Sequence, residues 1–89
     1  MVERDITIIN KLGLHARAAA KLISTTSAFS CDIRIDKAGR EVDAKSIMAV
    51  MMLAASKGTE LRIITNGEDE DAAMDAVAAL INNRFDEEE

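Results

Sequence analysis

Several residue types that other classes of protein depend on are rare or missing in this chain of 89 residues. There is no tryptophan or tyrosine, and two phenylalanines are the only aromatic residues, so the core must be built from Ile, Leu, Val, Met and Ala. A single cysteine, Cys31, excludes an internal disulfide and suggests a reducing compartment. One cysteine and one histidine are too few for an ordinary structural zinc site, so we expect no bound metal and no cofactor.

The charge balance and the apolar runs exclude further classes. Sixteen acidic residues against eleven basic ones leave a net charge of −5, whereas a general nucleic-acid binder would show a basic footprint. Residues 1–5 lack an apolar signal region, and the longest apolar run, residues 47–55, is far short of the roughly 20 residues that a membrane span needs. We therefore expect a cytoplasmic protein without membrane insertion, folded as a single domain over residues 1–89. The initial Met1 and the acidic tail favour a complete chain over a fragment of a larger protein.

Apolar periodicity divides the chain into four strands and three helices. Strands are predicted at residues 2–9, 31–36, 40–43 and 59–66, where apolar and polar residues alternate. Helices are predicted from residue 16 to 26, from Ser46 to a stop at Gly58, and from about residue 70 to 84, with residues 86–89 as a frayed acidic tail. The order βαββαβα predicts an α+β fold, with a four-stranded, mainly antiparallel sheet and helices packed on one face.

One stretch, residues 13–17, stands where a strand pattern gives way to a helix pattern and holds the only histidine, His15. The first N–H groups of a helix have no intrahelical partner and bind anions readily. A neutral imidazole is a competent nucleophile that could accept a phosphoryl group, and the forked guanidinium of Arg17 suits phosphate oxygens. The alternative is that His15 is only a polar residue at a helix start.

A second stretch, residues 47–55, is apolar on every side. A short helix cannot bury its whole circumference against one sheet, so some of Met48, Met51 and Met52 should face solvent and could dock a partner. The alternative is that these methionines fill an irregular core. Ser46 before them is either a plain N-cap or a regulatory phosphosite, where added negative charge could block a partner.

These two stretches together, with a Gly58-Thr59 exit, resemble the HPr family, the histidine-containing phosphocarriers of the phosphoenolpyruvate-dependent phosphotransferase system. The resemblance covers essentially the whole chain. Residues 10–13 and the Phe85-Asp86 ending are similar to NPr, the nitrogen-related branch of this family. The resemblance implies the open-faced β-sandwich fold, with three helices on one face of the sheet.

The family resemblance also implies roles for particular residues. His15 would take a phosphoryl group on Nδ1 from phosphorylated Enzyme I and pass it to an enzyme IIA-type acceptor. Arg17 would hold the phosphate, with backbone amides at Ala16, Arg17 and Ala18 as further donors. Ser46 matches the serine that HPr kinase/phosphorylase modifies in some members. The expected docking residues are Ile47, Met48, Met51 and Met52.

One residue departs from the family pattern, because Ala18 stands where proline usually follows the arginine. The absence of this proline should loosen the helix start slightly and leave one more free amide, that of Ala18. The chain has no second general base and no nucleotide-binding loop, so it reads as a monomeric carrier that partner enzymes act on, not as an enzyme. The rival interpretation is a regulatory binding module that is switched by phosphorylation at Ser46, at His15, or at both.

Overall fold

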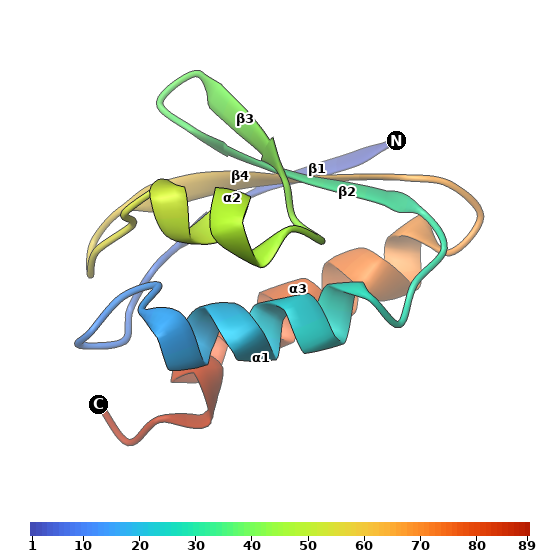
Figure 1. Ribbon diagram of the computed structural model, residues 1–89. Coiled ribbons are helices and arrows are strands. Elements are labelled where there is room, and N and C mark those ends of the chain that lie inside the picture. The colour runs from blue at the N-terminus through green and yellow to red at the C-terminus, as the bar shows by residue number, and fades with distance from the viewer.

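Four strands form one antiparallel sheet, and three helices cover one of its faces (Figure 1). The computed structural model describes residues 1–89. The strands are β1 (Val2–Thr7), β2 (Asp32–Lys37), β3 (Arg40–Asp43) and β4 (Glu60–Asn66), in the spatial order β1-β4-β2-β3. The helices are α1 (Ala16–Thr26), α2 (Ile47–Met52) and α3 (Glu70–Asn82), followed by a short turn, η1 (Arg84–Asp86). The predicted α+β class, element order and layering are confirmed, and all three strand pairings are antiparallel.

Strand register separates an apolar inner face from a charged outer face. Ile35 pairs with both Ile63 and Val42, and side chains in this row point toward the helices. On the outer face Arg62 lies between Asp5 and Asp36, with its Nε 3.0 Å from Oδ1 of Asp5. That hydrogen bond and the charge of Asp5 raise the pKa of the Arg62 guanidinium above its ordinary value. No layer covers this outer face, so charged side chains keep it in contact with water.

The core lies between the sheet and the helices and contains almost only aliphatic side chains. Its large, fully buried members come from every layer, and Phe85 is its one aromatic residue. Leu22 is the largest buried side chain of α1, whereas Ile23, one position on, is only partly buried. No helix of this structure is both long enough and apolar enough to cross a bilayer.

Helix α2 is shorter than the sequence predicted. It ends at Met52, with Leu53 as its C-cap, so the prediction that Gly58 terminates this helix is wrong. The chain leaves the helix because Ala54 adopts φ +52°, and this turn lets Leu53 and Ala55 bury their side chains in the core. Gly58 still has φ +92°, but it serves the loop into β4, where its N–H donates to the carbonyl of Ile8 at 2.7 Å.

The C-terminal segment, residues 84–89, contacts the body of the protein through Phe85, Glu87 and Glu89, whereas the sequence predicted a frayed tail over residues 86–89. Arg84, Phe85 and Asp86 all have positive φ, which turns the chain sharply after α3. Phe85 is fully buried, and its carbonyl accepts a hydrogen bond from Nζ of Lys21 on α1 at 2.9 Å. The chain end therefore lies on the same side of the molecule as the start of α1, with Glu88 and Glu89 exposed (Figure 1).

Candidate active site at the start of helix α1

His15 is the N-cap residue of α1, as the sequence predicted. Its backbone is extended, with φ −76° and ψ 176°, and its carbonyl accepts the N–H of Ala19 at 2.8 Å. Its side chain makes no capping hydrogen bond, and the amides of Ala16, Arg17 and Ala18 find no acceptor in the protein. The helix therefore begins with three unpaired N–H donors next to the imidazole, which is the arrangement that binds an anion.

The loop before His15 is held in place by two close backbone contacts. Gly13 has φ +68°, and a Cβ at this position would lie 2.4 Å from the carbonyl oxygen of Ala55. Only glycine allows this approach, and the next amide, of Leu14, then donates to the same oxygen at 2.8 Å. Leu14 buries its side chain, which anchors the residue directly before the histidine.

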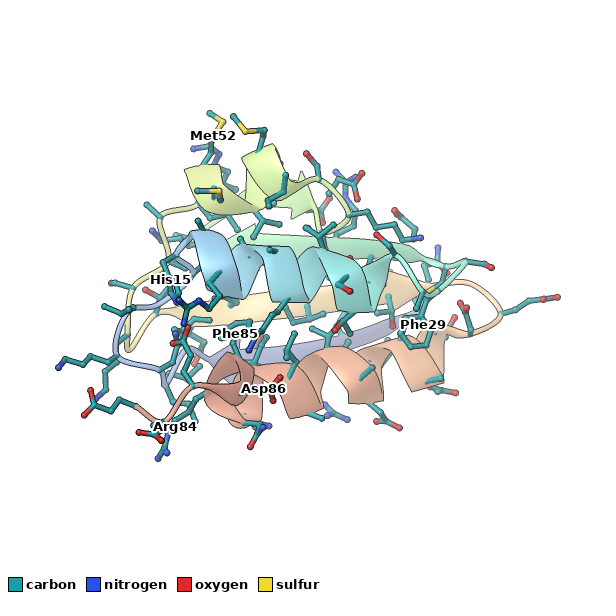
Figure 2. All side chains as sticks on the ribbon, turned by 60° about the horizontal axis from the view of Figure 1, so that its bottom comes forward. His15, Phe29, Met52, Arg84, Phe85 and Asp86 are labelled. Carbon is teal, nitrogen blue, oxygen red and sulfur yellow. The ribbon has the colours of Figure 1, made fainter.

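A carboxylate from the C-terminal segment contacts the imidazole. Nε2 of His15 is hydrogen-bonded to Oε2 of Glu87, and the other carboxylate oxygen accepts from Nδ2 of Asn10 at 3.0 Å. The His15 side chain is 26% exposed and that of Glu87 15% exposed, so both are partly shielded from water. Figure 2 shows His15 at the start of α1, facing the segment that carries Arg84, Phe85 and Asp86. Nδ1 of His15 has no hydrogen-bond partner in the protein.

Glu87 is ionised at neutral pH despite its partial burial. Burial acts to raise the pKa of this carboxyl, but hydrogen bonds from Asn10 and His15, with the positive charge of Arg17, outweigh burial and lower the pKa. Asn10 is itself fully buried, and its Nδ2 also donates to the carbonyl of Gly13 at 2.8 Å. The loop, the histidine and the chain end thus share one hydrogen-bonded network.

Sequence reasoning missed Glu87 and Asn10 as members of the site. Glu87 contacts Asn10 and His15, both more than 70 residues away in the sequence, and no local pattern reports such contacts. One signal was available: an apolar Phe85 inside an otherwise polar ending indicates a segment that is anchored to the core. A second anchor is the backbone of Lys11, whose N–H donates to the carbonyl of Glu89 at 2.9 Å.

Arg17 lies at the same helix start but makes no ion pair or hydrogen bond through its side chain. It is exposed and borders a surface hollow, together with Lys11, Leu12 and residues 87–89. The structure therefore brings His15 and Arg17 to one end of α1, with the guanidinium unengaged and available to an incoming anion.

Ser46 and the apolar residues after it form a second feature, next to α1. Oγ of Ser46 accepts the N–H of Ala49 at 3.4 Å, which makes this serine the N-cap of α2. Met48 and Met52 are 68% and 60% exposed, as the apolar pattern predicted, and Ile47 and Met51 are also exposed. Val50 alone faces the core. Helix α2 packs against α1, and Figure 2 shows Met52 pointing away from the body of the protein.

Cys31 lies at the far end of the molecule from this site and is buried. Burial and the neighbouring Asp69 carboxylate raise the pKa of its thiol, so it is a small core residue and not a reactive one. The carboxylate of Asp69 accepts the amides of Ser30 and Cys31 at 2.8 and 2.9 Å, and these donors lower the pKa of Asp69.

Comparison with known proteins identifies relatives of the whole chain. The profile of the protein family described as "PTS HPr component phosphorylation site" matches residues 2–83. A protein of Pseudomonas aeruginosa named phosphocarrier protein HPr is 59% identical over 86 residues, which is 96% of each chain. Phosphocarrier protein NPr of Shewanella violacea is 43% identical over 97% of this chain and 94% of its own. Among solved structures, HPr-C-His from Thermoanaerobacter tengcongensis superposes with a TM-score of 0.97 at 44% identity, over 100% of both chains.

Proposed function

Because this chain belongs to the HPr family of phosphocarriers of the phosphotransferase system, we propose that it carries the phosphoryl group on Nδ1 of His15. Proteins of this family are carriers and not catalytic enzymes, so His15 is a substrate for partner enzymes. The observation that carries the proposal is the state of the ring: Nε2 is engaged by Glu87, whereas Nδ1 has no partner. The unpaired amides of residues 16–18 stand beside it.

The surroundings of His15 suit a phosphoryl group that stays only briefly. The amides of Ala16, Arg17 and Ala18 would donate to phosphate oxygens, and the positive end of the α1 dipole would favour their charge. The Arg17 guanidinium, which has no partner of its own, would add a forked pair of donors. Phosphoryl transfer depends mostly on positioning and charge stabilisation, and the partner enzyme supplies the rest.

Family membership implies two partners, Enzyme I as the donor and an enzyme IIA-type protein as the acceptor. Both must reach His15, so we assign docking to the apolar residues exposed beside it, namely Ile47, Met48, Met51 and Met52. The chain would act as a monomer and as one HPr-like domain over residues 1–89. Its family also supports the cytoplasmic location that the sequence predicts.

Ser46 is proposed as a regulatory phosphosite for an HPr kinase/phosphorylase. It is only half-buried, and it directly precedes the exposed Ile47 and Met48. A phosphate there would place about two negative charges at the edge of the docking surface and weaken partner binding without unfolding the chain. Nitrogen regulation as the final purpose has only weak support, because the relative named NPr is 43% identical to this chain, whereas one named HPr is 59% identical.

Intact mass spectrometry after incubation with Enzyme I and phosphoenolpyruvate tests the carrier function. We expect a gain of one acid-labile phosphate that His15→Ala abolishes and Ser46→Ala leaves intact. A wild-type protein that gains no phosphate would refute the proposal. For the docking surface, Met48→Glu should raise the KM that Enzyme I shows for this protein, whereas Glu68→Gln, on the loop before α3, should not. Equal KM values for both variants would contradict the assignment.

A further inference from the structure

The contact between His15 and Glu87 determines which ring nitrogen carries a proton. A neutral imidazole has one N–H nitrogen and one with a free lone pair, and only the second can attack phosphorus. An ionised carboxylate can only accept hydrogen bonds. Because Nε2 of His15 meets Oε2 of Glu87, the proton lies on Nε2 and the lone pair lies on Nδ1.

Glu87 is held in the orientation that this contact needs. Oε1 of Glu87 accepts a hydrogen bond from Nδ2 of Asn10. Because an amide nitrogen can only donate, the atom of residue 87 that faces Asn10 must be an acceptor; a second donor at that position would leave two donors facing each other. Asn10 is fully buried and is fixed in turn by its bond to Gly13. The other charged groups around the carboxylate are Arg17 and Lys11, the second of which pairs with Glu89 at 3.3 Å, and the exposed Glu88.

We propose that Glu87 is a positioning residue for phosphoryl transfer, which keeps Nδ1 of His15 nucleophilic and stabilises the charge that the ring gains. The inference rests on the proposed function of His15. It extends that function to a residue of the C-terminal segment that no pattern around the histidine indicates.

The transfer step needs no proton movement when Glu87 is in place. The Nδ1 lone pair of His15 forms the bond to phosphorus, while the bond between phosphorus and the donor atom of phosphorylated Enzyme I breaks. The donor atom keeps that electron pair. The ring becomes an imidazolium with phosphorus on Nδ1 and its original proton on Nε2, and the Glu87 carboxylate faces the new positive charge. Transfer to the acceptor reverses these changes.

The substitution Glu87→Gln tests this arrangement with almost no change in shape. The side-chain oxygen of the new amide would still accept from Asn10, so its NH₂ group would face Nε2 of His15. Nε2 must then accept, and the proton moves to Nδ1, where it blocks the nucleophile. We expect the ¹⁵N shifts of the ring, measured at about pH 9, well above the ordinary imidazole pKa of about 6.5, to report a reversed tautomer. The rate of transfer from phosphorylated Enzyme I should fall at least about tenfold.

Glu68→Gln is the matched control, because it removes the same charge from an exposed residue on the loop before α3, outside the site. It should leave both the tautomer and the rate unchanged, and a backbone amide spectrum checks that each variant is folded. Glu87→Ala is a second variant, which should give a mixture of tautomers and a smaller loss of rate. The proposal is overturned if wild-type protein is phosphorylated and Glu87→Gln keeps its tautomer, or transfers as fast as or faster than wild type. A wild-type protein that is not phosphorylated at all would instead refute the function of His15.

Discussion

Replacing Phe85 by alanine should detach the C-terminal segment from the site without touching His15. Phe85 is fully buried and is the only core side chain from residues 84–89. Removing a buried phenylalanine side chain in a rigid core costs about 3–5 kcal/mol, because a cavity remains. Here the segment is at the chain end and can peel away, so no cavity has to persist.

The expected loss is therefore smaller than in a rigid core. Peeling gives up the transfer free energy of the side chain, about 2–3 kcal/mol, and the hydrogen bonds from Lys21 and Asn10 to the segment, about 1 kcal/mol each. It also relieves three consecutive left-handed residues, each of which costs about 1 kcal/mol or more. We expect Phe85→Ala to lower the free energy of unfolding by only about 1–2 kcal/mol, while the segment becomes mobile.

Urea denaturation and amide hydrogen exchange measure the two effects separately. The amides of Asp86 and Glu87, which donate to the carbonyls of Asn83 and Arg84, should lose protection while those of β4 keep it. The tautomer of His15 should also lose its bias. Phe85→Leu is the control, since it keeps most of the apolar contact. A loss of 4 kcal/mol or more with residues 86 and 87 still protected would refute this reasoning and show that the segment is a rigid part of the core.

Three further expectations follow from the geometry. Gly13→Ala should lower the free energy of unfolding by more than about 2 kcal/mol in urea titrations, because its Cβ would meet the Ala55 oxygen and its φ is left-handed. Gly39→Ala, at φ +91° with open space around it, should show only the backbone penalty, and equal losses would contradict the clash. The free energy of unfolding should fall as pH drops below about 4.5, because folding lowers the pKa values of Asp69, Glu70 and Glu87. These carboxylates stabilise the fold at pH values above their unfolded-state pKa, and that stabilisation is lost as the pH falls through their folded-state pKa. Glu87→Gln should flatten this acid-side slope, and an unchanged slope would argue against it. Ala18→Pro should leave the transfer rate within tenfold, about 1.4 kcal/mol, because the Ala18 amide has no protein acceptor and the amides of Ala16 and Arg17 would still donate to the phosphate; a larger rise would show that alanine impairs the site.

Elements with a clear apolar period could be predicted from the sequence almost to the residue. Helix α1 begins and ends where expected, and the bounds of strands β1 and β4 differ from the predicted ones by only one or two residues. The predicted helix α2 was too long because Ala54 and Ala55 are good helix formers. The turn at Ala54 is explained only by the burial of Leu53 and Ala55 in the tertiary structure.

The site was predictable in part for the same reason. His15, its helix start and Arg17 lie in one short stretch, so local rules and the family resemblance both find them. Glu87 lies among acidic residues that are typical of a solvated tail, and its role depends on a contact across the whole chain. Local patterns carry no information on such a pairing, and Phe85 was the only residue that pointed to it.

The placement of the exposed apolar side chains has a consequence for encounters with other proteins. Apart from Met1, the large ones come from the loop before α1 and from α2, whereas the outer sheet face carries charged residues. A protein that approaches the outer face of the sheet finds no apolar surface to bury and dissociates quickly. If partners dock on these apolar side chains, as proposed, a bound partner would already be oriented with its reacting group near the imidazole. The position of the exposed apolar side chains thus favours encounter complexes in one orientation.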